Sequence, residues 1–325
     1  MMDRSDRHFR FLTRTLAPHA LLYTEMLAAR ALLRGDARRL LRFDAAEHPV
    51  ALQLGGAEPE ELASAARLGE QMGYDEVNLN VGCPSDRVQA ACFGAALMLD
   101  AGRVADCVAA MRGAVSVPVT VKTRLGVDEH DSYEFLTAFV TRVAAAGCDT
   151  FIVHARKAWL SGLSPKENRE IPPLDYPRVH RLKRDYPALT IVINGGLVER
   201  ATALTQLERV DGVMLGRAAY QQPWLVAELD RAVFGAGLAQ TLEHVLERYL
   251  LYIERELAAG TPLRSMTRHL LGLRTGLPGG RRWRRALSEL ADGHVGLARL
   301  REIAALTDAH AGRGGVDIGA AYALG

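Results

Sequence analysis

Between about residue 20 and residue 216, the chain alternates short apolar segments with helical patterns. One amphipathic stripe runs through residues 59–72, where Pro59 suits the first helical turn, and another runs through residues 132–146, where Gly147 provides the stop. Seven apolar segments have the length and composition of strands, namely residues 21–24, 50–54, 76–80, 117–122, 150–154, 189–194 and 212–215. This alternation predicts parallel strands with helices outside.

Seven strands are one fewer than an eight-stranded barrel contains. An open doubly wound sheet would need a glycine-rich turn after its first strand, and no GxGxxG occurs. We therefore predict an α/β fold of the (β/α)8 TIM-barrel type, with its first strand missing or truncated. After residue 240 the pattern is helical only, with apolar stripes over residues 244–258 and 287–306. The expected domains are a barrel, residues 1–236, and a C-terminal helical domain, residues 237–325.

Polar residues stand out where the predicted strands end. In a barrel of this type the carboxyl ends of the strands carry the active site, so residues from different strands meet over one pocket. These residues are Gln53, Asn80 with Cys83, Lys122 with Arg124, His154, Asn194-Gly195-Gly196 and Gly216-Arg217. Lys122 ends an otherwise apolar strand, a place where lysine is rarely buried without a partner.

The segment from Asn78 to Ser85 begins as a strand and breaks at Gly82 and Pro84, which holds Cys83 on the turn. Taken alone, such a cysteine is usually a structural thiol. The turns at residues 194–196 and 216–217 each precede a helix. Together they favour a phosphate site, because glycine lets backbone amides approach an anion.

Composition narrows the class of protein. Apolar residues make up 49% of the chain and charged residues 24%, and no run of about 18 apolar residues occurs, so we expect a soluble protein without a membrane span. The charged residues at the start of the chain argue against a signal peptide. The cysteines show no CxxC spacing, which favours a reducing cytoplasm and argues against disulfides and a metal site. They are Cys83, Cys92, Cys107 and Cys148.

Segments along the whole chain match the motifs of one protein family. They are Met1-Met2-Asp3 with Ser5–His8, Gln53–Gly56, Asn78–Ser85, Phe93–Ala95, Val121–Arg124, His154–Arg169, Asn194–Gly196, Gly216-Arg217, Thr267–His269 and Arg281–Arg285. The chain resembles the tRNA-dihydrouridine synthases, and within them the A-type subfamily that acts on D-loop uridines. The run from His154 to Asn168 is long and specific enough to indicate this subfamily.

The resemblance implies an enzyme that uses FMN, is reduced by NADPH and converts tRNA uridines, at positions 20/20a, to dihydrouridine. The uridine would be flipped out of the tRNA, because a stacked base cannot bring its C5–C6 bond to a flavin. Reduced flavin would deliver a hydride to C6, and Cys83 would donate a proton to C5. Lys122 would stabilise the anionic reduced ring, and Asn80 would touch the uridine. The implied cofactor-binding residues are Met1, Met2, Gln53, Lys122, His154, Asn194, Gly195, Gly196, Gly216 and Arg217.

An arginine-rich segment, from Arg264 to Arg285, contains seven arginines and no acidic residue. It is either a solvated helix face or a surface for backbone phosphates, with Trp283 adding stacking. The family resemblance favours tRNA contacts on the helical domain. The residues expected to contact tRNA, besides Asn80, are Lys166, Arg169, Arg281, Arg282, Arg284 and Arg285.

The sequence also departs from the family pattern. The strand ending in Ala-Pro that usually precedes Met-Met is missing, so either the true start lies upstream or the barrel is open at one edge. Arg4 stands where an aromatic residue is common, and Cys92 falls in a variable loop. Two other functions stay open: a flavin barrel of the dihydroorotate-dehydrogenase kind acting on a free pyrimidine, and a tRNA-binding protein that has lost catalysis. We expect a monomer.

Overall fold

The computed structural model describes residues 1–85, 93–235 and 241–311, and in the last helix it describes side chains as far as residue 305. These residues form two compact units, which we describe one at a time. The first, the barrel unit, consists of Met1–Asp3 and Leu21–Gly216. The second, the helical unit, consists of Arg4–Ala20 and the chain from Arg217 onward.

The barrel unit is built on a parallel sheet with the strand order β1-β3-β4-β5-β6-β7-β8, and β2 pairs with the end of β3. The strands are β1 (Leu22–Tyr23), β2 (Leu27–Ala28), β3 (Val50–Gly55), β4 (Glu76–Val81), β5 (Val119–Arg124), β6 (Thr150–His154), β7 (Thr190–Asn194) and β8 (Gly212–Met214). Strands that follow one another along the chain lie side by side, as the (β/α)8 fold requires. In the described part of the chain, no strand precedes β1 and no ladder joins β8 to β1.

The seven predicted strands are confirmed as β1 and β3 to β8, with boundaries shifted by at most two residues. The TIM-barrel type of fold is confirmed with them. Strand β2 was not predicted, because two residues are too few to carry a periodic pattern.

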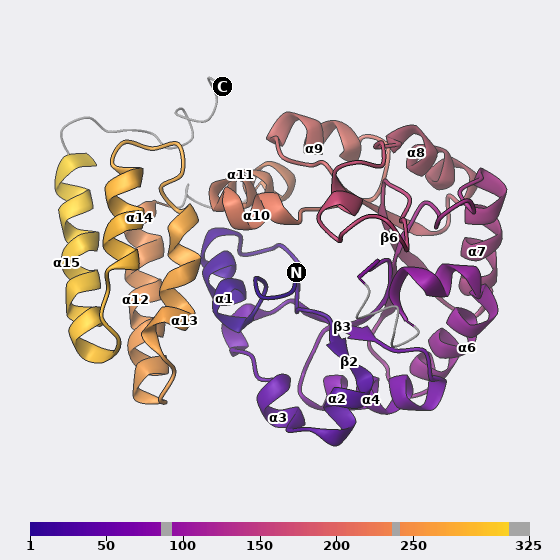
Figure 1. The fold of residues 1–325 in the computed structure, drawn as a ribbon, viewed down its shortest axis with the longest axis horizontal. Coiled ribbons are helices and arrows are strands. Elements are labelled where there is room, and N and C mark those ends of the chain that lie inside the picture. The colour runs from indigo at the N-terminus through magenta and orange to yellow at the C-terminus, as the bar shows by residue number, and fades with distance from the viewer. Residues whose placement is uncertain (86–92, 236–240, 312–325) are drawn as a thin grey trace. The chain divides into compact units, whose positions relative to one another are not determined.

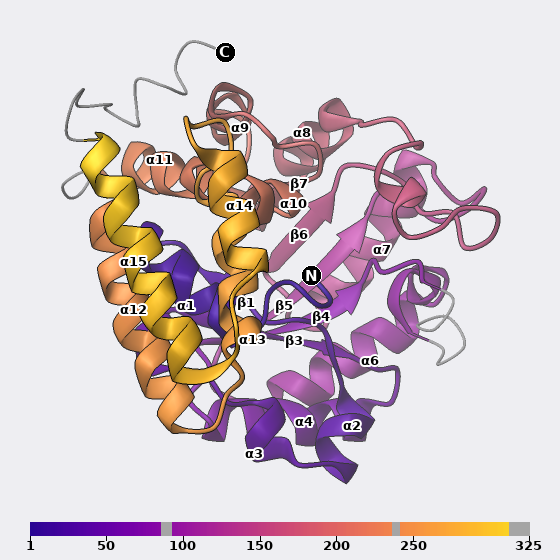
Figure 2. The ribbon, with the colours of Figure 1, turned by 60° about the vertical axis from the view of Figure 1, so that its left-hand side comes forward.

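Helices cover the outside of the sheet (Figure 1; Figure 2). They are α2 (Ala29–Arg34), α3 (Ala37–Leu40), α4 (Pro59–Gln71), α6 (Ala101–Arg112), α7 (Tyr133–Ala145), α8 (Tyr176–Asp185) and α9 (Arg200–Leu207), with 3-10 turns η1 (Ala45–Glu47), η2 (Gly94–Leu99) and η3 (Glu167–Arg169). Helices α4 and α7 confirm the two predicted stripes. The Ser132 hydroxyl caps α7 by accepting a hydrogen bond from the Phe135 amide at 3.1 Å.

The two faces of the sheet differ in polarity. Leu52 and Val77 face α4, because a Cβ built on Gly69 of α4 would lie 2.5 Å from Leu52 and 3.8 Å from Val77. Successive strand residues point to opposite faces, so Gln53 and Asn78 point away from α4, into the interior of the sheet. On β3 and β4, apolar residues therefore pack the sheet against its helices, and polar residues line the other face.

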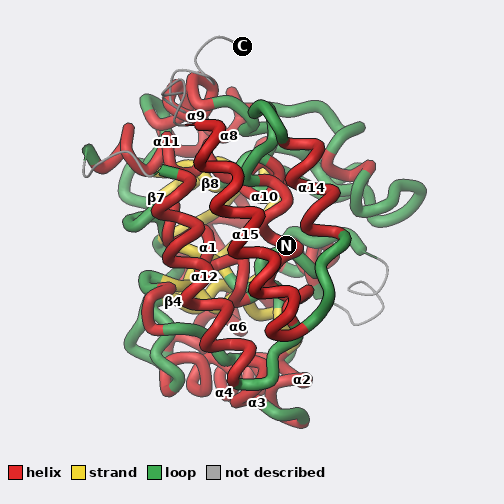
Figure 3. The backbone as a smooth tube through the Cα atoms, turned by 90° about the vertical axis from the view of Figure 1, so that its left-hand side faces the viewer, coloured by secondary structure: helices red, strands yellow, loops and turns green. Residues whose placement is uncertain are grey.

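The helical unit buries one apolar core. Its helices are α1 (Arg7–Leu16), α10 (Arg217–Gln221), α11 (Pro223–Phe234), α12 (Leu242–Ala258), α13 (Leu263–Thr267), η4 (Arg268–Gly272), α14 (Gly280–Ser288) and α15 (Gly293–Ala311) (Figure 1; Figure 3). Leucines make up much of this core, and the aromatic side chains of Tyr249, Tyr252 and Trp283 are buried among them. None of the helices in the described residues is both long and apolar enough to cross a membrane.

The predicted stripe at residues 244–258 is confirmed as α12, but the single stripe over residues 287–306 is wrong. The helical conformation is interrupted between α14 and α15. There the Asp292 carboxylate accepts a hydrogen bond from the Leu263 amide at 2.7 Å, and Gly293 takes a φ of +72°. An apolar stripe does not reveal such a break, because leucines continue on both sides of it.

The sequence pattern did not predict α1 as a helix, nor where it packs. Phe11, Leu12 and Leu16 of α1 lie in the same core as Trp224 of α11. Residues 4–20 and 217–235 therefore group with the C-terminal helices in the compact units. The predicted domains are continuous segments, residues 1–236 and 237–325, whereas each compact unit combines segments that are distant in the sequence. The division into domains therefore stays a prediction.

Candidate active site

Side chains from four neighbouring strands meet at the carboxyl edge of the barrel sheet. The register pairs Asn80 with Lys122, Arg124 with His154, and His154 with Asn194. Because these strands are parallel, the ends of β4, β5, β6 and β7 lie level with one another. The structure thus brings together the residues that the sequence placed on separate strands.

The turn after β4 holds Cys83 at two points. The Asn80 side-chain oxygen accepts hydrogen bonds from the amides of Gly82, at 3.1 Å, and Cys83, at 3.0 Å. The Cys83 carbonyl accepts a further bond from the Ala95 amide at 2.9 Å. The thiol is free and half-buried, and its one side-chain hydrogen bond within the described residues is to the Ser85 hydroxyl at 3.6 Å. A reactive group is therefore carried on a constrained backbone and remains accessible.

Arg124 fastens this turn to the loop after β6. Its Nε donates to the Gly82 carbonyl at 2.9 Å, and its Nη1 donates to the carbonyls of Lys157, at 3.0 Å, and Asn168, at 2.9 Å. Burial, followed by the charges of nearby arginines, lowers the pKa of Arg124 to about 10. The guanidinium stays charged at neutral pH and binds three backbone carbonyls of two loops, a positioning role that the sequence did not reveal.

Asn80, Lys122, His154 and Asn194 form a group at this edge that we call the strand-end cluster, and Lys122 is its cation. Its Nζ donates to the Asn194 side-chain oxygen at 3.1 Å, and Asn194 in turn donates to the Met214 carbonyl at 2.7 Å. Burial, and then the charge of Arg124, lower the pKa of Lys122 to about 8. The ammonium has three donors and one partner in the described residues, so it can bind an anionic or carbonyl-rich group.

His154 is held neutral beside this lysine. Burial is the first cause and the charges of Arg124 and Lys122 follow, and together they lower the pKa of His154 well below its ordinary range. Gly195, with a φ of +108°, lets the imidazole lie against the backbone, because a Cβ there would come within 2.5 Å of the His154 ring. The Tyr176 hydroxyl also donates to the Gly195 carbonyl at 2.7 Å.

The loop after β6 carries the two other predicted tRNA contacts of the barrel unit. Lys166 and Arg169 are exposed at the two ends of the segment that contains η3. Between them Asn168 is fully buried, and its side chain bonds both the amide and the carbonyl of Trp159, at 2.7 and 2.8 Å. The asparagine fixes the loop from which the two cations project.

Some of the predicted cofactor-binding residues do not belong to the strand-end cluster. Met2 is 57% exposed. A Cβ on Gly216 would meet nothing within 4 Å, so protein packing does not require glycine there. Arg217 is the first residue of α10, in the helical unit. The roles of Met1, Met2, Gly216 and Arg217 stay predictions.

The predicted arginine cluster lies on α14, where Arg281, Arg282, Arg284 and Arg285 are exposed. Among the described residues, Arg281, Arg282 and Arg284 have no ion-pair partner, whereas Arg285 pairs with Glu289 at 2.8 Å. The expected stacking by Trp283 is wrong. This side chain is 1% exposed and donates its indole N–H to the Leu270 carbonyl at 2.9 Å, so it packs in the core rather than against a base.

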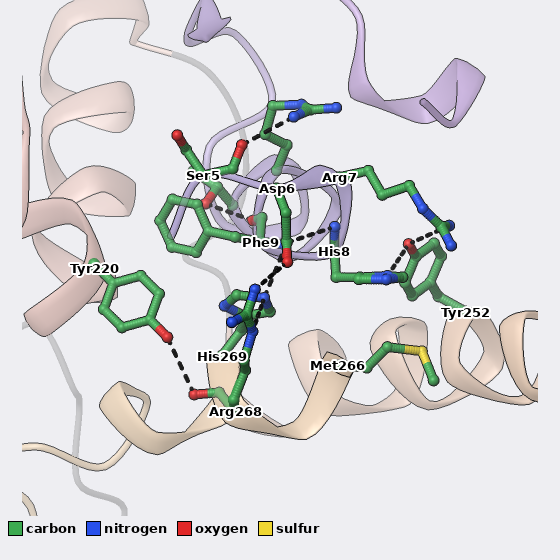
Figure 4. A network of polar contacts seen from close by, with 12 residues as sticks. Ser5, Asp6, Arg7, His8, Phe9, Tyr220, Tyr252, Met266, Arg268 and His269 are labelled. Atoms are coloured by element: carbon green, nitrogen blue, oxygen red, sulfur yellow. Dashed lines mark hydrogen bonds and ion pairs between the residues drawn. The ribbon is translucent and has the colours of Figure 1, made fainter. Parts of the chain in front are cut away.

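Two family motifs of the helical unit bind each other (Figure 4). Asp6 caps α1 by accepting from the amides of His8 and Phe9, and its carboxylate pairs with Arg268 and with His269, the latter at 2.9 Å. Burial alone would raise the pKa of Asp6, but the hydrogen bond and charge of His269, the Phe9 amide and Arg268 lower it well below the ordinary value. This network ties α1 to the segment α13–η4.

The donor set fits a flavin better than a metal. A partly buried ammonium, a neutral imidazole and amide side chains at one sheet edge suit an anionic, carbonyl-rich ring. No group of three or more His, Cys, Asp or Glu side chains is placed to hold a metal ion in the part of the chain that the structure describes. The fold and the strand-end site together define a parallel α/β-barrel enzyme.

Comparison with known proteins gives the family. The model of the dihydrouridine synthase (Dus) family matches residues 1–310. A curated protein of Shewanella oneidensis is 58% identical over 294 residues, which cover 90% of this chain and 87% of the relative. A Vibrio cholerae protein is 56% identical over 295 residues, covering 90% and 89%, and an Escherichia coli protein is 57% identical over 293 residues, covering 90% and 85%. All three relatives are named tRNA-dihydrouridine(20/20a) synthase.

This chain belongs to the dihydrouridine synthase family. It is therefore a flavin-dependent oxidoreductase that modifies tRNA. The family resemblance drawn from the motifs is confirmed.

Proposed function

We propose that the protein reduces the C5–C6 double bond of uridines 20 and 20a in the D loop of tRNA, with FMN bound at the strand-end cluster and NADPH as the reductant. The single observation that carries the proposal is the placement of the free Cys83 thiol, on a turn held by Asn80, at the same sheet edge as Lys122, His154 and Asn194. The names of the close relatives support the choice of tRNA and of positions 20 and 20a.

Lys122, His154, Asn194, Gly195 and Gly196 would hold the flavin. FMN, once reduced by NADPH, supplies the hydride that the uridine receives at C6. Lys122 then provides a fixed positive charge for the added electrons, which a partly buried ammonium does better than a hydrated one. Gln53 would donate to the ring, and the two late turns, with Gly216 and Arg217, would hold the phosphate.

Cys83 acts as the general acid. Its S–H bond breaks as a C–H bond forms at C5 of the uridine, and the thiolate is reprotonated from solvent. The hydrogen bond from the Cys83 amide to the Asn80 side-chain oxygen keeps the Cys83 backbone in place during this transfer. The Asn80 side chain has a second N–H that can donate to the uridine. The uridine must leave its stack to reach this turn, and Lys166 and Arg169 would bind the displaced tRNA backbone.

The helical unit would supply the rest of the tRNA surface. Arg281, Arg282 and Arg284 project from α14 as exposed cations, and exposed arginines without acidic partners suit backbone phosphates. Arg285 contributes less, because Glu289 already neutralises it. Because the relatives are named for acting on tRNA, we also propose a cytoplasmic location, and we propose that one chain suffices for activity.

The test is reduction of defined tRNA transcripts by the purified protein. We expect a yellow protein that consumes NADPH and forms dihydrouridine at positions 20 and 20a, located by mass spectrometry of nuclease fragments. A transcript with cytidine at both positions is the matched control and should stay unreduced. Reduction of free orotate or uridine instead of tRNA would favour the free-pyrimidine flavin enzyme. A protein that binds tRNA but neither FMN nor NADPH would be an inactive binder.

A further inference from the structure

Buried polar side chains line the interior of the barrel sheet below the strand-end site. Gln53, Glu76, Asn78, Asn80 and Thr120 are each at most 9% exposed. Barrel interiors are usually filled by branched apolar residues, and an unsatisfied buried polar group costs about 1–3 kcal/mol. Five such groups at neighbouring positions of β3, β4 and β5 therefore call for a physical reason.

Their hydrogen bonds form one continuous path. The Thr120 hydroxyl donates to the Glu76 carboxylate at 2.7 Å, and the Asn78 amide donates to the Thr120 hydroxyl at 2.8 Å. The Gln53 amide donates to Asn78 at 2.9 Å, and the Asn80 amide donates to Gln53 at 2.9 Å. We call this path the Glu76–Asn80 chain.

The Glu76–Asn80 chain ends at the proposed proton donor. The Asn80 oxygen accepts the amides of Gly82 and Cys83. The path thus runs from the amino end of β4, across β5 and β3, back to the turn at the carboxyl end of β4.

The groups at both ends of the Glu76–Asn80 chain require its hydrogen bonds to run in the same direction. Backbone N–H groups can only donate, so the Asn80 oxygen must face the turn, and its NH2 must face Gln53. At the other end one Glu76 oxygen, Oε1, accepts from both the Thr120 and the Tyr23 hydroxyls, so the Thr120 hydroxyl is left to accept from Asn78. Burial raises the pKa of Glu76, and these two hydrogen bonds oppose the rise. Each amide between them then has one orientation that leaves no buried group unpaired.

We propose that Thr120 and Glu76 are positioning residues, which fix the Gln53 and Asn80 amides through the Glu76–Asn80 chain and thereby hold the turn that carries Cys83. Neither residue belongs to the strand-end cluster. If the Thr120 hydroxyl is lost, the Asn78 NH2 has no acceptor, and an amide that rotates to find one breaks the bonds to Gln53 and Asn80. The role in turnover rests on the proposed function of Cys83, but the hold on its backbone does not.

Tyr23 provides a matched control. Its hydroxyl donates to the same Glu76 oxygen as Thr120, at 2.6 Å, but no bond of the chain toward Asn80 passes through it. Thr120→Val and Tyr23→Phe therefore each remove one hydroxyl from the same carboxylate, and only the first interrupts the path to Cys83. Thr120→Ser keeps the hydroxyl and serves as the rescue variant.

The experiment measures how fast iodoacetamide alkylates Cys83, read by mass spectrometry of the Cys83 peptide, with and without FMN. Turnover on tRNA and thermal unfolding are measured on the same proteins. We expect Thr120→Val to raise the alkylation rate at least about threefold and to lower turnover by roughly tenfold or more, since small misplacements of a reacting group are that costly. Tyr23→Phe and Thr120→Ser should stay within about twofold of wild type in both measurements.

Equal alkylation rates for Thr120→Val and Tyr23→Phe, at similar loss of thermal stability, would overturn the inference. If Thr120→Val does not fold, Thr120→Ala takes its place, because it removes the same hydroxyl without placing a second methyl in the polar interior. If the wild-type protein is inactive on tRNA, the proposed function is wrong. The difference in alkylation rate between Thr120→Val and Tyr23→Phe would still show whether the Glu76–Asn80 chain holds the turn.

Discussion

The strand ends of the barrel unit and helix α14 of the helical unit place their positive charges in opposite ways. In the barrel unit, Lys122 and Arg124 lie at strand ends, and burial lowers their pKa values to about 8 and about 10. In the helical unit, Arg281, Arg282 and Arg284 stand on the outer face of α14, over a core that contains Trp283. The strand ends of the barrel unit remove these cations from water, whereas the surface of α14 leaves its arginines exposed to water.

Buried and exposed cations are suited to different functions. A desolvated cation interacts strongly with a group a few ångströms away, so it can stabilise charge on a small ring. Exposed cations are screened over about 10 Å, and they act together on a polyanion by releasing its counterions. Chemistry should therefore respond to changes at the strand ends, and tRNA affinity to changes on α14.

The largest effect should come from Cys83→Ala. The thiol makes one side-chain hydrogen bond within the described residues, so its removal should leave the fold and the bound flavin intact. Turnover on tRNA should fall by about 10²–10⁴-fold, the usual contribution of a general acid. Single-turnover oxidation of the reduced enzyme by tRNA measures it. Near-normal turnover would move the acid role to another group.

Lys122→Met should weaken FMN binding and slow flavin reduction by NADPH, by roughly 10–100-fold, because it removes the fixed charge before tRNA arrives. The pH dependence sharpens this test. The ammonium is charged below a pKa of about 8, so its contribution should be present at neutral pH and lost as the pH rises through about 8. Fluorescence titration of FMN against pH should show this loss in wild type and not in the mutant. An unchanged affinity and reduction rate would exclude the role.

Asp6→Asn should destabilise the helical unit by about 1–3 kcal/mol, because it removes the charge opposite Arg268 and His269 while an amide oxygen can still cap α1. The lowered pKa of Asp6 gives the sign of the pH effect. Its contribution is present above its ordinary value of 3.8 and is lost as the pH falls below it. The deficit of the mutant should therefore shrink in acid.

Denaturation followed by tryptophan fluorescence can measure this deficit, since Trp224 and Trp283 both lie in the core of the helical unit. Asp6→Ala, which removes the cap as well, should add about 1 kcal/mol. Equal stability of wild type and Asp6→Asn at pH 7 would show that the network in Figure 4 does not stabilise the unit.

The smallest effect should come from the surface of α14. Replacing Arg281 and Arg284 with alanine should weaken tRNA binding by about tenfold at moderate salt and flatten the salt dependence by roughly one unit of slope for each phosphate that is no longer bound. Flavin reduction without tRNA should not change. Arg285→Ala is the matched control, and it should have less effect because Arg285 is already paired with Glu289.

Affinity measured against salt concentration, with stopped-flow flavin reduction beside it, separates the outcomes. If affinity and slope match wild type, the arginines are a solvated face. If flavin reduction falls as well, the two units are coupled, and the division of work drawn from their charges is wrong.

The sequence by itself determined the strand ladder and the strand-end residues. Period-two alternation and turn residues are local signals, so β3 to β8 and the edge carrying Asn80, Lys122, His154 and Asn194 could be read from them. The motifs also sufficed to recognise the family, which the comparisons confirm. Periodicity does not, however, tell a buried tryptophan from an exposed one within a basic helix, and Trp283 was misread for that reason.

Only the tertiary structure decided which distant residues are partners. Asp6 and Arg268 lie 262 positions apart, and Thr120 and Glu76 lie 44 apart, so no local pattern links either pair. The same holds for α1, which packs with the C-terminal helices although it opens the chain. Local sequence sets where a strand or helix forms, whereas hydrogen-bond satisfaction of buried polar groups is settled only when the chain has closed around them.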